Sequence, residues 1–95
     1  MKVRKLKKMW VGPLKVSGSV RMIARGLLQF LKQHPELGVQ EEEEKLSAAL
    51  EENNIRNMPY IIDELDSLMQ EIAPQGYVFA LKEGRYGFWE DRRAA

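Results

Sequence analysis

Few residues in this chain combine a reactive side chain with a spacing that supports catalysis. His34 is the only histidine, and it stands at the end of a predicted helix directly before Pro35, where we expect a solvated ring. Asp63 and Asp66 lie three positions apart on another predicted helix. Acid–base chemistry needs a cleft that a chain of this length barely provides, so we interpret the two aspartates as part of an exposed acidic face.

The four consecutive glutamates at positions 41–44 could attract a divalent cation, but consecutive helical residues point in different directions. They suit the first turn of a helix, where the helix dipole favours negative charge. The chain also lacks cysteine, a Walker-type phosphate loop and a nucleophile elbow. We therefore expect no enzyme, and no catalytic residue, metal site, cofactor or small-molecule substrate.

Composition indicates one small domain. The chain has 95 residues, of which 44% are hydrophobic and 31% charged, as is typical of a globular protein with a single core. The absence of cysteine is compatible with a reducing compartment, and no apolar stretch is long enough for an export signal or a membrane span. We expect a cytoplasmic protein without a membrane partner.

Opposite charges are segregated along the chain. The first 35 residues contain nine Lys or Arg and no acid, whereas residues 36–76 contain eleven acids and two bases. The formal net charge of +1 hides this division. The two segments either neutralise each other within one chain or present two charged surfaces to partners.

Hydrophobic periodicity predicts an α+β fold, with three helices packed on a small antiparallel sheet. The apolar spacing predicts helices over Val20–His34, Gln40–Asn53 and Met58–Ile72, the last of which should form the spine of the core. A C-terminal β-hairpin is expected from Tyr77–Lys82 and Arg85–Trp89, which flank a short Gly-containing connection.

The stretch Met9–Val16, which Gly12-Pro13 interrupts, is expected to add a bent edge strand to this hairpin. Three helices followed by a hairpin form a winged-helix-like order. The expected domain organisation is a flexible basic arm over residues 1–8, a single globular domain over 9–90 and a charged tail over 91–95.

One hypothesis is a small nucleic-acid-binding or regulatory protein that contacts DNA or RNA through phosphates. The arm would contribute a mobile group of cations, the first helix a fixed stripe of cations about one turn apart, and the hairpin one arginine. The expected contacts are Lys2, Arg4, Lys5, Lys7, Lys8, Arg21, Arg25, Lys32 and Arg85. Tyr86 and Trp89 lie near Arg85, and aromatic residues beside a cation on a strand are one way in which proteins stack bases, but three residues are too few to be specific.

The third helix carries Asp63, Glu64 and Asp66 on its polar face, so we expect no recognition helix of the usual kind. The alternative function is a protein-interaction module, either a homodimer or a small adaptor or inhibitor that presents its acidic helices. A third possibility is that the first helix packs beside the other two and that the opposite charges neutralise one another.

The C-terminal segments Ala73–Phe79 (APQGYVF) and Tyr86–Glu90 (YGFWE) resemble the ending of small uncharacterised proteins of bacterial mobile elements and phages. Those proteins share an A-P-x-G-Y-x-F stretch and a G-F-W close. Where they have an acidic Gly-rich loop, this chain has only Glu83-Gly84. The resemblance implies a prokaryotic or viral setting and a helix-plus-hairpin end, and it implies no activity.

Overall fold

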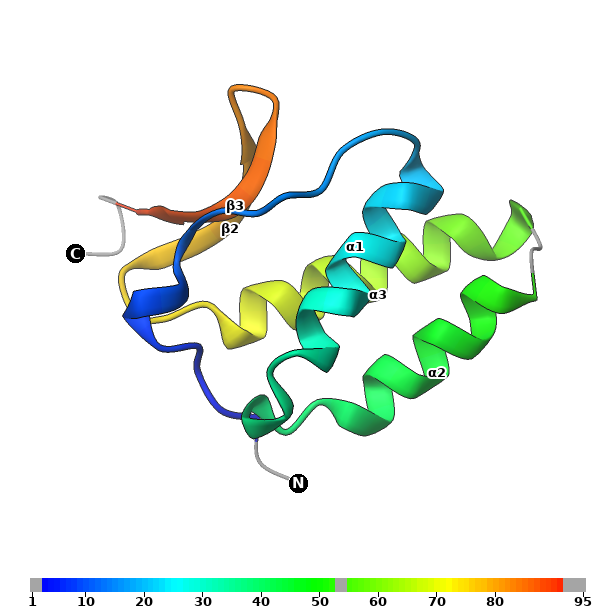
Figure 1. The fold of residues 1–95 in the computed structure, drawn as a ribbon, viewed down its shortest axis with the longest axis horizontal. Coiled ribbons are helices and arrows are strands. Elements are labelled where there is room, and N and C mark those ends of the chain that lie inside the picture. Colours follow the sequence, from blue (N-terminus) through cyan, green and yellow to red (C-terminus); the bar gives the residue numbers. More distant parts are fainter. Residues whose placement is uncertain (1–2, 53–54, 92–95) are drawn as a thin grey trace.

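Three helices and a three-stranded antiparallel sheet form the protein, whose computed structural model describes residues 3–52 and 55–91 (Figure 1). The predicted α+β fold class is confirmed. The helices are α1 (Val20–Lys32), α2 (Gln40–Glu51) and α3 (Met58–Ile72), and the strands are β1 (Gly12–Pro13), β2 (Tyr77–Lys82) and β3 (Arg85–Glu90). Three short 3-10 turns join them, namely η1 (Lys8–Trp10), η2 (Pro35–Leu37) and η3 (Ile55–Asn57).

The helix ends follow local signals in the sequence. The Ser19 Oγ caps α1 by accepting a hydrogen bond from the Met22 amide at 3.3 Å. α1 ends before the predicted His34, because the residue before a proline is excluded from the helical region and His34 adopts φ −128° and ψ 65°. α3 has the predicted bounds. The predicted end of the second helix at Asn53, and the tail after Asp91, lie outside the described residues.

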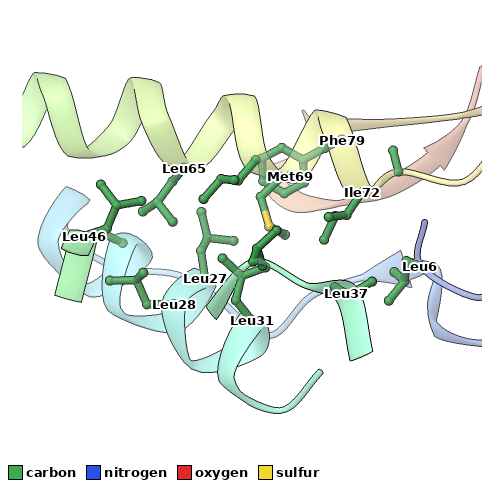
Figure 2. Packing of buried hydrophobic residues seen from close by; sticks show 14 of the residues in the cluster. Leu6, Leu27, Leu28, Leu31, Leu37, Leu46, Leu65, Met69, Ile72 and Phe79 are labelled. Carbon is green, nitrogen blue, oxygen red and sulfur yellow. The ribbon is translucent and has the colours of Figure 1, made fainter. Parts of the chain in front are cut away.

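The core lies between α3, α1 and the inner face of the hairpin. Figure 2 shows Leu65 and Met69 of α3 directed toward Leu27 and Leu31 of α1. The predicted role of α3 as the spine of the core is confirmed, because its buried residues follow the apolar stripe: Ile61, Leu65, Leu68, Met69 and Ile72. The sheet contributes Phe79 and Phe88, whose rings lie 5.6 Å apart between centroids.

β3 is the central strand, and β1 approaches it very closely. The sheet order is β1-β3-β2, so the predicted edge strand is present, but only two residues of the expected Met9–Val16 pair with β3. A Cβ built on Gly87 would stand 2.5 Å from the Gly12 carbonyl oxygen and 2.9 Å from the Pro13 Cα. Only glycine at position 87 lets the two backbones lie this close.

The outer edge of β2 is closed by a side chain of α3. The Gln70 Nε2 donates to the Phe79 carbonyl, and the Gln70 Oε1 accepts from the Phe79 amide at 3.2 Å. The side-chain amide therefore satisfies the two backbone groups that a further strand would use at this position.

Gly87→Ala should loosen β1 from the sheet. The added Cβ meets backbone atoms, which cannot rotate away as a side chain can, so we expect the free energy of unfolding to fall by about 1–3 kcal/mol. Hydrogen exchange at the Leu14 amide, which donates to the Tyr86 carbonyl at 2.8 Å, reports on β1 specifically. We expect this amide to lose more protection than the amides of α3. Unchanged protection of the Leu14 amide from exchange would contradict the close approach of β1 to Gly87.

Candidate nucleic-acid interface

The basic N-terminal segment is attached to the folded body over residues 3–6, which differs from the expected flexible arm over residues 1–8. The Arg4 amide donates to the Leu37 carbonyl at 2.8 Å, and the Leu6 amide donates to the Ile72 carbonyl at 2.7 Å. Leu6 is 3% exposed and lies at the end of the core beside Leu37 and Ile72 (Figure 2). Leu6 is the apolar residue among these cations, and burial of its side chain attaches the segment to the core. Lys2 lies outside the described residues.

Two cations of this segment face the chain's own negative groups. The Lys5 Nζ donates to the Glu71 carbonyl at 2.6 Å, near the C-terminal end of α3, where the helix dipole favours a cation. Hydrogen bonds from its own backbone amide and from His34, together with the positive charge of Lys7, lower the pKa of the Glu36 carboxyl. Lys5 and Lys7 therefore offset charge within the protein.

Two of the three cations in the expected phosphate-facing stripe of α1 contact α2. The Arg21 Nη2 donates to the Leu50 carbonyl at 3.1 Å, near the end of α2. The Lys32 Nζ lies 3.5 Å from the Glu43 Oε1. Arg25 and Lys32 are both exposed, and Arg25 has no such contact to α2 among the hydrogen bonds and ion pairs described. The charges of the two helices thus neutralise each other in part.

Glu43 explains why Lys32 is needed at this position. The residue is only 5% exposed, although its neighbours Glu42 and Glu44 are exposed. Its Oε1 also accepts a hydrogen bond from the Ser47 Oγ at 3.0 Å. A buried carboxylate without partners would be strongly unfavourable, so Lys32 and Ser47 stabilise the first turn of α2 against α1.

Lys15 and Arg85 meet at a hollow beside the hairpin turn. The hollow has a volume of about 550 Å³, and both cations are exposed. Its lining contains no acidic residue and consists of Pro13, Leu14, Lys15, Val16, Ser17, Gly84 and Arg85. Sequence reasoning included Arg85 but missed Lys15. The register of β1 on β3 places Lys15 there. Pro13 lies opposite Gly87, and two further residues in each direction bring Lys15 to Arg85.

The aromatic residues of β3 lie on opposite faces of the sheet, as the alternation of side chains along a strand predicts. Tyr86 is stacked on Phe79 at 5.7 Å on the inner face. On the outer face the Trp89 Nε1 donates to the Ala80 carbonyl at 3.0 Å, and the Lys82 Nζ lies 6.0 Å from the centre of its ring.

The expectation of a solvated His34 is wrong. The ring is 7% exposed, because Trp10 and Phe30 pack on it with centroid distances of 5.0 and 4.7 Å. Its Nδ1 lies 2.9 Å from the Glu36 Oε1, so one polar atom of the ring has a partner at the surface. The sequence gives no sign of this cluster, since Trp10 is far from the ring along the chain.

No protein-family model, curated protein or solved structure matches the chain. Within residues 3–52 and 55–91, no group of three or more histidine or acidic side chains could hold a metal ion. No helix in the described part of the chain is long and apolar enough to cross a membrane. The candidate interface therefore rests on the positions of its cations in the structure and on no similarity to a known protein.

Arg21→Ala and Arg25→Ala should affect stability very differently. Arg21 is partly buried and bonded to α2, so its loss should lower the free energy of unfolding by about 1.5 kcal/mol. Arg25 is exposed on the same helix and is the matched control, with an expected change within about 0.5 kcal/mol. Urea denaturation measures both values. Equal effects would contradict the assignment of Arg21 to the contact between α1 and α2.

Proposed function

We propose that this protein binds nucleic acid through its phosphates, with the hollow between Lys15 and Arg85 as the principal contact. The supporting observation is that two exposed cations border one open cavity of about 550 Å³ whose lining has no acid. A guanidinium forms paired hydrogen bonds with phosphate oxygens, and an ammonium adds a mobile point charge. Together they suit adjacent phosphates of a polynucleotide backbone.

Arg4 and Lys8 are further candidates for the proposed contact, in the segment that precedes Lys15. Both side chains are exposed. The chain runs from η1, which contains Lys8, through β1 on β3 to Lys15, so a nucleic-acid backbone that followed this segment would meet Lys8 before Lys15. Arg21 and Lys32 are not part of the proposed contact, since both are directed at α2.

Contacts of this kind are independent of base sequence, because phosphates carry no sequence information. α3 is unsuited to a groove of duplex DNA, since its exposed side includes Asp63, Glu64 and Asp66. The proposed function is accordingly non-enzymatic binding of DNA or RNA, and affinity should depend strongly on salt.

The double charge reversal Lys15→Glu/Arg85→Glu tests the proposal. We expect Kd for labelled nucleic acid to rise by more than about tenfold, and the slope of log K against log salt to fall by roughly 2 for duplex DNA, as the loss of two phosphate contacts requires. Fluorescence anisotropy with single-stranded DNA, duplex DNA and RNA at about 50 and 200 mM salt measures both quantities.

The matched control is Arg25→Glu/Lys45→Glu, which makes the same change in net charge at exposed positions of α1 and α2. We expect it to change Kd by less than about threefold, because the charges lie away from the proposed contact and are screened. Equal losses in the two variants would mean that only net charge matters. Absence of binding by the unaltered protein at low salt would refute the proposed function.

A second candidate function is protein interaction, in which the helices bind a partner or a second copy of the chain. Val20 and Met22 at the start of α1 are 54% and 60% exposed, and exposed apolar side chains favour association. Pairing through the edge of β2 is disfavoured, because Gln70 occupies the backbone groups of Phe79.

Light scattering at low and high salt tests this second function. Association through the oppositely charged segments should give a dimer mass at low salt that falls toward 11.0 kDa as salt rises. Met22→Ser should weaken the dimer further if the apolar start of α1 lies in the interface. A constant monomer mass under all conditions would contradict self-association.

A further inference from the structure

Trp10 is exposed to an extent that the fold does not require. Its side chain is 49% exposed, and the preceding Met9 is 76% exposed. Both belong to the turn η1, which none of the three helices covers in Figure 1. Water contact on a large aromatic surface is unfavourable, so a turn that presents Met9 and Trp10 together suits a surface that receives a ligand.

The Trp10 ring is nevertheless held in place from the protein side. It meets the His34 ring edge to face, with an interplanar angle of 69° and 5.0 Å between centroids. His34 in turn packs on Phe30 and bonds to Glu36, and it is buried. The Trp10 amide donates to the Lys7 carbonyl at 3.0 Å, which fixes the turn. Such an arrangement orders the indole before any ligand arrives, which lowers the entropy lost on binding.

Cations flank this indole along the chain. Lys8 immediately precedes Met9, and Lys15 follows at the hollow, and both are exposed. An ordered, exposed aromatic ring within a line of cations is the combination that binds unpaired bases, because the ring stacks on a base while the cations hold the phosphates on either side.

We infer that Trp10 is a stacking site for a base of single-stranded nucleic acid. This inference rests on the proposed function and adds the class of substrate: a strand whose bases are unpaired. In a duplex the bases are already stacked and paired, so Trp10 can reach one only at the cost of unstacking it. Binding should therefore favour a single strand over a duplex of the same length, and Trp10 should supply the preference.

The fluorescence of Trp10 gives a direct readout. The chain has two tryptophans, so Trp89→Phe leaves Trp10 as the single indole. Titration of this variant with a short oligothymidylate should quench the Trp10 emission, with the same midpoint as the anisotropy of the labelled strand. A contact that involves only phosphates would raise the anisotropy without quenching.

Trp10→Leu should weaken binding of the single strand by about tenfold, the loss of one base–aromatic stack, and should change duplex binding by less than about twofold. Trp10→Phe, which keeps a smaller aromatic ring, should retain most of the affinity, and circular dichroism checks that each variant is folded. Tyr60→Leu is the matched control, because Tyr60 is 57% exposed at the start of α3, and this end of α3 lies opposite η1 in the protein (Figure 1). We expect Tyr60→Leu to change the affinity for neither the single strand nor the duplex.

The outcomes separate the inference from the proposed function. Binding without quenching, or equal weakening of single-strand and duplex binding by Trp10→Leu, would overturn the stacking role and leave phosphate binding in place. If Trp10→Leu has no effect on either affinity, the exposed turn serves another partner, such as a protein, and the inference fails. No binding of any strand at low salt would refute both.

Discussion

The apolar face of α3 is the surface on which the rest of the molecule depends. α1, α2 and β2 all pack on this helix. The N-terminal segment is bound to the last residue of α3 by a hydrogen bond, which the Leu6 amide donates to the Ile72 carbonyl at 2.7 Å. Ile72 and Met69 of α3 are completely buried, so the elements that pack on α3 must cover them with apolar side chains. The orientation of the charged residues follows from this packing.

The oppositely charged segments are brought together in part by that packing. α1 lies beside α2, so Arg21 and Lys32 stabilise the helix pair. Lys5 contacts the end of α3. Other cations are exposed, among them Lys8 in η1 and Lys15 and Arg85 beside the hairpin turn. A net charge of +1 therefore coexists with a hollow beside the hairpin turn whose lining contains Lys15 and Arg85 and no acid.

Much of the fold could be predicted from the sequence, because helix stripes, caps and hairpin turns are local signals. α3 and β2 have the predicted bounds, and the α1 cap is at Ser19. The site was less predictable. Lys15 carried no local signal, since its position beside Arg85 depends on the approach of β1 to Gly87. Burial of Leu6 likewise depends on helix ends that are distant in the chain.

The sequence by itself determined the elements, their order and the segregation of charge, because each of these follows from neighbouring residues. Tertiary structure decided which cations contact the protein's own groups. Arg21 meets a carbonyl 29 residues away and Lys5 one 66 residues away, so composition and periodicity do not report these contacts. The contact of Trp10 with His34, a residue 24 positions away, depends on tertiary structure in the same way, and the Trp10 side chain remains 49% exposed. Long-range packing thus decides which cations stabilise the fold through contacts that the sequence alone does not report.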